Sequence, residues 1–190
     1  MGGTRRYLPS FWKDYMRNVK VFSIVMFILY ATLTPNARAA VSVPNYSDSY
    51  TITNIGNYEM DYRTLKLKIF FKKYNSPLTP YAKYFVYWAD VYNIDWRLIP
   101  AISGVESTFG KRIPKNSFNA YGWANGEYRF SSWEDSIEHV TKTLRLKYKD
   151  KGAVTIKSIA RRYAPPSSTW GGKVEFFMSK IDSTPLEFDL

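Results

Sequence analysis

The stretch AISGVESTFGK, residues 101–111, sets a single carboxylate, Glu106, in a run of small and apolar side chains. The run is typical of the last turns of a helix, which we predict to extend from Trp96 to Thr108. Asp95 precedes this helix as a cap, and Gly110 follows it as a terminator. The stretch therefore predicts a largely apolar helix with one acidic residue near its C-terminal end.

Helical spacing brings Ile102, Val105 and Phe109 next to Glu106. Burial of a lone carboxylate among such residues is costly for the anion, so it raises the pKa toward neutrality. A carboxyl group that stays protonated is what a general acid needs to protonate a glycosidic oxygen. The alternative is that Glu106 faces solvent or pairs with a nearby base, and periodicity alone favours it; the candidate bases are Arg97, Lys111 and Arg112.

Helical segments recur along the rest of the chain. Apolar spacing and end signals predict helices over residues 61–74, 80–92, 133–148, 155–163 and 170–181. The first of them has a strand as its alternative, because Leu65, Leu67 and Ile69 also alternate. Residues 111–132, with several Gly, Asn and Ser, predict a loop or a small hairpin. The sequence thus predicts a mainly α domain of five to six short helices with one small loop or hairpin insert.

End signals make three of these predictions specific. Thr79 is the predicted N-cap of the 80–92 helix, with Pro80 at its first position. Ser132 is the predicted N-cap of the 133–148 helix, which Gly152 ends. Pro100, inside the helix that carries Glu106, removes one backbone hydrogen bond and predicts a slight kink near its start.

The composition excludes several classes of site. The 190 residues include no Cys and one His, His139, so a disulfide framework, a thiolate metal site, a cysteine nucleophile and a two-His zinc motif are all ruled out. Three acidic residues at 134, 135 and 138 fall at the start of a predicted helix, where acidic residues are expected in any case. We expect neither a metal nor an organic cofactor, and a packed or surface role for His139.

The N-terminal region predicts export. A basic stretch precedes an apolar run at residues 21–33, which is short for a bilayer span and typical of a signal-peptide core. Ala37-Arg38-Ala39 fits a cleavage site, so residues 1–39 are a predicted signal peptide; the alternative is an uncleaved membrane anchor over residues 19–33. Residues 40–60 are expected to form a tether or weakly ordered arm, and residues 61–190 the folded domain.

The formal net charge is +11, and a good part of the excess lies in the first 39 residues. For an exported protein this charge suits an anionic cell-wall polymer or a lipid surface. A nucleic-acid-binding domain would gather its basic residues on one face, whereas these are spread along several predicted helices. We therefore expect a monomer that binds no nucleic acid.

Four blocks, in order, resemble the lysozyme-like peptidoglycan hydrolases: AISGVESTFGK (101–111), NSFNAYGW (116–123), FSSWEDSIEHVTKTLRLKY (130–148) and IARRYAPPSSTWGGKVEFFMSKI (159–181). They are most similar to bacterial endo-β-N-acetylglucosaminidase domains of the mannosyl-glycoprotein endo-β-N-acetylglucosaminidase type, and also resemble soluble lytic transglycosylases. The likeness spans residues 77–181 and implies a lysozyme-like helical domain.

The resemblance implies roles only at matching positions. Glu106 takes the place of the catalytic acid, and Tyr163 that of a tyrosine which approaches the acid. Flat aromatic faces suit sugar rings, which adds Trp123 and Trp170, although a Trp at a helix start is more often a core residue. The residues expected to contact substrate are Ser107, as hydrogen-bonding neighbour of the acid, Asn119 and Tyr121, at the acetamido sugar, and Trp123, Tyr163 and Trp170.

Glucosaminidases of this kind often hold a second carboxylate between the second and third blocks. That interval is only residues 124–129 here, and Glu127 is its sole carboxylate. Glu127 is therefore the candidate second catalytic residue, with a solvated turn residue as the alternative. If no second carboxylate reaches the site, the 2-acetamido group of the sugar can act as nucleophile.

The resulting hypothesis is an exported hydrolase of the cell wall, cell surface or extracellular space. It would cut the β-1,4 glycan backbone of peptidoglycan or a related amino-sugar polysaccharide, with Glu106 as general acid. Two alternatives share the fold: a lytic transglycosylase, which closes a 1,6-anhydro ring with Glu106 alone, and a non-catalytic glycan-binding module.

Overall fold

The computed structural model describes residues 55–186. The predicted signal peptide and the part of the predicted arm before residue 55 lie outside the described residues. Residues 55–60 are described and belong to the packed domain: Ile55 is buried, and the ring of Tyr58 meets Tyr87 edge-on at 5.5 Å. The packed domain therefore starts ahead of the predicted boundary at residue 61.

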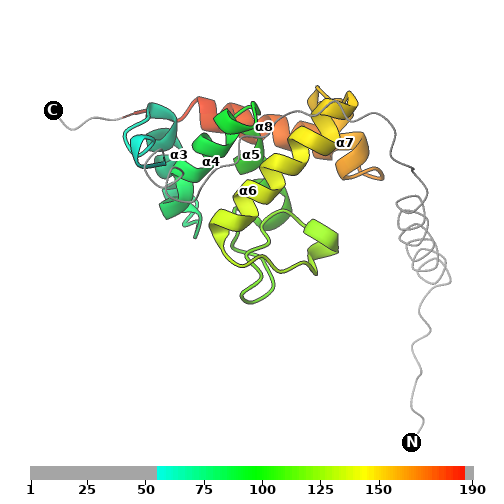
Figure 1. The fold of residues 1–190 in the computed structure, drawn as a ribbon, viewed down its shortest axis with the longest axis horizontal. Helices are drawn as coiled ribbons and strands as arrows, with labels where there is room; N and C mark the ends of the chain where they lie inside the picture. Colours follow the sequence, from blue (N-terminus) through cyan, green and yellow to red (C-terminus); the bar gives the residue numbers. More distant parts are fainter. Residues whose placement is uncertain (1–54, 187–190) are drawn as a thin grey trace, which may run out of the picture. The chain divides into compact units, whose positions relative to one another are not determined.

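Helices and short helical turns build the described chain, and residues 55–186 contain no strand (Figure 1). The α-helices are α3 (Tyr62–Lys73), α4 (Ala82–Val91), α5 (Leu98–Ser107), α6 (Trp133–Thr143), α7 (Ile156–Tyr163) and α8 (Trp170–Asp182). The short turns are η1 (Thr79–Tyr81), η2 (Trp123–Gly126), η3 (Leu144–Tyr148) and η4 (Lys149–Lys151). The predicted mainly α fold is confirmed. No helix in the described part of the chain has both the length and the apolar character needed to cross a membrane.

Side-chain caps explain why several helices begin where they do. The Ser132 hydroxyl accepts a hydrogen bond from the backbone N–H of Asp135, as predicted. Thr155 caps α7 in the same way. Residues 62–73 form a helix, so the alternative of a strand is wrong; Leu67 is fully buried while Ile69, two positions on, is exposed.

Two helix starts differ from the predictions. Thr79 lies inside the 3₁₀ turn η1, where its hydroxyl donates to the Ser76 carbonyl, so it does not cap α4. Helix α5 begins at Leu98, which places Pro100 in its first turn. The backbone nitrogens of a first turn have no partner within the helix, so Pro100 removes no hydrogen bond and the reason for a kink disappears.

The end of α5 is also earlier than the predicted terminator. Thr108 has a left-handed backbone, with φ 55°, and its neighbour Phe109 follows with φ 58°. The chain thus leaves the helix before Gly110, which continues the left-handed run at φ 79°. This turn points Phe109 back into the core, where it is 1% exposed.

Helix α5 packs against both α8 and α6. Gly104 makes this packing close: a Cβ atom there would lie 2.5 Å from the ring of Phe109. Around Phe109 gather the rings of Phe70, Tyr74 and Phe177. The helix that carries Glu106 is therefore fixed on several sides.

The insert at residues 111–132 is a loop rather than a hairpin, and it lies below α5 and α6 in Figure 1. It contains η2, in which Ala124 and Asn125 have left-handed backbones. After the loop come α6, the π-helical turn η3 and the turn η4. This helical segment ends at Gly152, whose φ is 84°. The extent predicted for the 133–148 helix is confirmed, with its last turn wound more widely than an α-helix.

Candidate active site

Glu106 sits in the last turn of α5 and reaches α8. One of its carboxyl oxygens, Oε1, accepts a hydrogen bond from the indole Nε1–H of Trp170 at 2.7 Å. Trp170 is the first residue of α8 and only 4% exposed. The contact of α5 with α8 thus holds the carboxyl group from one side.

The surroundings of Glu106 differ from the predicted apolar burial. Ile102 and Phe109 are buried in the core, whereas Glu106 is an exposed residue. The exposure of Glu106 agrees with the alternative that it faces solvent. The ion pair of that alternative is not present within residues 55–186: Arg97 pairs with Asp95 and Asp182, and no described base pairs with Glu106. Glu106 therefore stands at the surface as a residue, while its carboxyl group is partly buried against the indole of Trp170.

Two effects act on the pKa of Glu106, and they oppose each other. Partial burial of the carboxyl group raises the pKa, while the hydrogen bond from Trp170 lowers it. Burial is the larger effect, so the pKa lies above the ordinary glutamate value. The group accordingly keeps its proton to higher pH than a free carboxyl would, as predicted for a general acid.

Gly122 closes the second side of the carboxyl group. Its backbone is left-handed, with φ 65°, and a Cβ atom on it would lie 2.8 Å from Oε2 of Glu106. The backbone angle favours glycine at this position, and a side chain there would displace the carboxyl group from its present place. Oε1 faces Trp170 and Oε2 faces Gly122.

Tyr163, at the end of α7, ties these parts together. Its ring stacks on Trp170 at 4.9 Å and 24°, and its hydroxyl donates to the backbone carbonyl of Tyr121 at 2.6 Å. Burial first, and then the negative charge of Glu106, raise the pKa of Tyr163. Tyr163 thus approaches the acid, as the resemblance implies, and fixes the backbone just before Gly122.

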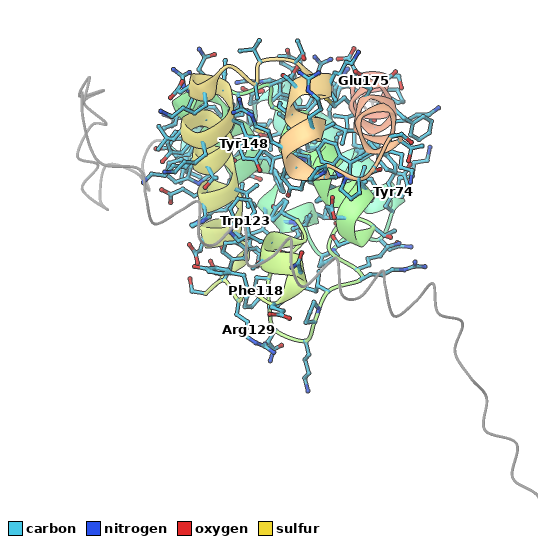
Figure 2. All side chains as sticks on the ribbon, turned by 90° about the vertical axis from the view of Figure 1, so that its right-hand side faces the viewer. Tyr74, Phe118, Trp123, Arg129, Tyr148 and Glu175 are labelled. Atoms are coloured by element: carbon cyan, nitrogen blue, oxygen red, sulfur yellow. The ribbon has the colours of Figure 1, made fainter. Side chains whose placement is uncertain are left out.

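A hollow of about 260 Å³ opens beside this arrangement. Its walls come from the loop, from η3 and from α7, and Figure 2 shows Trp123 and Tyr148 near one another on one face. Such a volume with aromatic walls suits a sugar unit. The lining residues are Tyr121, Gly122, Trp123, Ala124, Asn125, Tyr148 and Tyr163.

Three residues that the resemblance assigned to substrate are used inside the protein instead. Ser107 is 2% exposed; its hydroxyl donates to the carbonyls of Ser103 and Ala120 and accepts from the Gly110 N–H. These bonds join the end of α5 to the loop, so Ser107 is a structural neighbour of the acid and no sugar contact.

Asn119 and Tyr121 are the other two. Asn119 is 2% exposed, and its amide binds the backbone of Trp123 through both its nitrogen and its oxygen. The nitrogen also donates to the Tyr128 carbonyl at 3.0 Å. The ring of Tyr121 is fully buried, so only its backbone is placed to border the hollow. Both residues build the loop rather than contact a sugar.

The remaining candidates divide clearly. Trp123 is partly exposed and lines the hollow, and its ring meets His139 edge-on at 5.6 Å. Trp170 is buried and holds Glu106, so its expected role as a sugar platform is wrong. Glu127 is exposed and lines a different hollow with Ser117 and Arg129, so the structure does not bring it together with Glu106.

Four residues that line the hollow were not among the predicted site residues: Gly122, Ala124, Asn125 and Tyr148. Gly122 carried a signal in the block NSFNAYGW, where a glycine stands between two aromatic residues in a loop. Tyr148 carried none, because it looked like the last residue of an ordinary helix. Within residues 55–186 no group of three or more His, Asp or Glu side chains is placed to hold a metal ion.

Comparison with known proteins adds no relatives to this picture. No family model matches the sequence, and no curated protein is significantly similar to it. The case for a function therefore depends on the residues of the site.

Proposed function

We propose that the chain is an exported enzyme that cleaves the β-1,4 glycan backbone of peptidoglycan or a related amino-sugar polysaccharide. Glu106 is its general acid. The observation that carries the proposal is a carboxyl group with a raised pKa, held by Trp170, next to an aromatic hollow of about 260 Å³. The proposal includes membership of the lysozyme-like superfamily, on the four sequence blocks.

The hydrogen bond from Trp170 assigns a position to the acidic proton. An indole N–H only donates, so Oε1 of Glu106 must accept from it. The proton of the neutral carboxyl group is then carried by Oε2, the oxygen that faces Gly122. A glycosidic oxygen bound next to Gly122 would receive this proton as its bond to the sugar breaks.

The position of Glu127 bears on the second half of the reaction. Two-carboxylate glycosidases hold one carboxylate on each side of the scissile bond. Glu127, however, lines a different hollow. No Asp or Glu among residues 55–186 lines the hollow itself, and Glu106 meets it only at Gly122. We infer that the substrate supplies the nucleophile, through the 2-acetamido group.

The same observation favours a second candidate, a lytic transglycosylase. In that reaction the sugar's own 6-hydroxyl attacks the anomeric carbon and closes a 1,6-anhydro ring. Glu106 would protonate the leaving oxygen and then accept the proton of the hydroxyl group. Hydrolysis and ring closure share the first step and differ in the product, so product chemistry separates them.

Digestion of purified peptidoglycan tests the proposal. The wild-type chain is expected to release soluble fragments, and Glu106→Gln to reduce the rate by about 10²–10⁴-fold, because the amide cannot donate the proton. The control Glu175→Gln changes an exposed carboxylate on α8 and should keep full activity. Mass spectrometry then assigns reducing ends to hydrolysis and anhydro-sugars to transglycosylation. Binding of the wild-type chain to peptidoglycan without either product would overturn the enzyme and leave a glycan-binding module.

A further inference from the structure

The positive charge of the domain is concentrated in one part of the described chain. Residues 55–141 carry eleven basic and nine acidic residues, which nearly balance. Residues 142–173 carry nine basic residues against Asp150 alone. Basic residues thus occur on several helices, but the excess of positive over negative charge lies in residues 142–173.

Five exposed residues of this segment form what we call the basic ridge. They come from η3, from η4 and from α7, and they are Lys147, Lys151, Lys157, Arg161 and Arg162. The guanidinium group of Arg162 donates to the backbone carbonyl of Lys151 at 2.6 Å. This bond holds α7 beside the η3–η4 turn, so the elements that carry the five side chains lie next to one another.

The charge of the basic ridge is not neutralised by the domain itself. Arg145 pairs with Asp150, the only acidic residue of the segment. No residue of the basic ridge pairs with a carboxylate among residues 55–186, whereas Arg63 on α3 contacts both Asp61 and Asp90. Unpaired cations that stand together attract an anionic partner.

The basic ridge borders the hollow of the candidate active site. Tyr148 and Tyr163, which line the hollow, are the chain neighbours of Lys147 and Arg162. Burial raises the pKa of Tyr148, and the positive charge of Arg162 opposes this rise. A polymer in the hollow therefore has positive charge along one edge.

We propose that the basic ridge binds the carboxylates that the glycan strand itself carries, so that the site selects anionic amino-sugar strands over neutral ones such as chitin. This inference rests on the proposed function, because it places the strand in the hollow beside Gly122. The position of the ridge is the reason for choosing the strand as its partner. A substituent on a sugar in the hollow arrives at the ridge without a second molecule.

Binding by the inactive Glu106→Gln chain tests this without cleavage. The ridge variant adds Lys147→Gln, Lys157→Gln and Arg161→Gln. The matched control adds Lys72→Gln, Lys73→Gln and Lys180→Gln, exposed residues of α3 and of the last turn of α8; Figure 1 shows α3 at the opposite end of the domain from α7. Each chain is titrated with peptidoglycan, with peptidoglycan whose carboxylates have been amidated, and with chitin, at low and high ionic strength. Circular dichroism checks that each variant folds.

The ridge variant should bind peptidoglycan roughly tenfold more weakly than the control at low ionic strength, as three exposed ion pairs would predict. The difference should vanish at high ionic strength, on amidated strands and on chitin. Equal affinity of the ridge variant and the control for peptidoglycan would overturn the proposal, and so would an equal loss on chitin. A larger ridge-dependent loss on anionic phospholipid vesicles or duplex DNA would assign the ridge to that partner instead.

The two proposals fail separately. A wild-type chain that releases no product, with ridge-dependent binding intact, overturns cleavage and keeps the ridge. A chain that cleaves peptidoglycan and chitin equally, with no effect of the ridge variant, overturns the ridge and keeps the enzyme.

Discussion

Trp170→Phe isolates the hydrogen bond on which the acidity of Glu106 depends. The substitution removes the indole N–H and keeps an aromatic ring for Tyr163 to stack on. Because that hydrogen bond lowers the pKa of Glu106, its loss should raise the pKa further. A general acid works only while protonated, so the alkaline limb of the pH–rate profile should move to higher pH.

The size of the shift follows from the strength of the bond. Hydrogen bonds to charged groups contribute about 1.5–3 kcal/mol. Glu106 is an exposed residue, so solvent screening places this bond at or below the lower end of that range. One pKa unit corresponds to about 1.4 kcal/mol, so we expect a shift of about one pH unit at most. The rate at the optimum should fall as well, because the carboxyl group loses its fixed orientation.

Two measurements check this reasoning. The first is kcat/KM for peptidoglycan fragments as a function of pH, and the second is the pKa of Glu106 itself, from NMR titration of ¹³C-labelled glutamate with Glu106→Gln to assign the signal. Trp133→Phe is the control, since Trp133 is also a buried first residue of a helix and lies outside the site. The role given to Trp170 would be refuted if the alkaline limb of the pH–rate profile and the pKa of Glu106 both stayed in place, or both moved to lower pH.

Three further outcomes are expected. Gly122→Ala puts a Cβ 2.8 Å from Oε2 of Glu106 at a backbone of φ 65°. The free energy of unfolding should fall by about 1–2 kcal/mol, and kcat/KM of the chain that remains folded should fall as well. A loss of stability with an unchanged kcat/KM would contradict this. Gly104→Ala crowds the ring of Phe109 at 2.5 Å and should lower the urea midpoint by the equivalent of about 1–3 kcal/mol; an unchanged midpoint would show that the core repacks freely. Glu106→Gln should be more stable than the wild type at neutral pH. The folded-state pKa of Glu106 is raised, so the stability that the glutamate contributes is complete below the unfolded value of 4.5 and is lost as pH rises through the folded pKa. The difference in Tm should therefore disappear below pH 4.5, and a wild type that is the more stable chain at neutral pH would contradict the sign.

The helices were predictable because their signals are local. Ser132 caps α6 and Gly152 ends the helical segment, each through the backbone of its own neighbours. The predictions that failed depended on the exact residue at which a helix starts. Asp95 bonds to the N–H of Arg97, as a cap would, but the helix starts at Leu98, two residues later than predicted. This register decides whether Pro100 costs a hydrogen bond.

The site was less predictable than the fold, for a physical reason. Glu106 stood out because a carboxylate in an apolar helix needs an explanation, whatever packs around it. The hydrogen-bond partners of loop residues, by contrast, follow no regular spacing in the sequence. Asn119 and Ser107 are polar side chains whose direction depends on contacts with residues 4 to 13 positions away, such as Trp123 and Ala120. Nothing local distinguishes an amide that faces a cleft from one that faces the backbone.

Those two residues show how the site holds its geometry. Left-handed backbones at non-glycine residues cost about 1–3 kcal/mol each and persist only where other contacts fix them. Six such residues follow Glu106 along the segment 108–125, which leads from the end of α5 to the hollow: Thr108, Phe109, Asn116, Phe118, Ala124 and Asn125. Ser107 and Asn119 supply the bonds that fix this segment, so polar groups expected at the sugar hold the loop in place. The space between Gly122 and Oε2 is too small for a Cβ atom and depends on where this backbone lies, and buried hydrogen bonds hold a backbone more firmly than solvent-exposed ones.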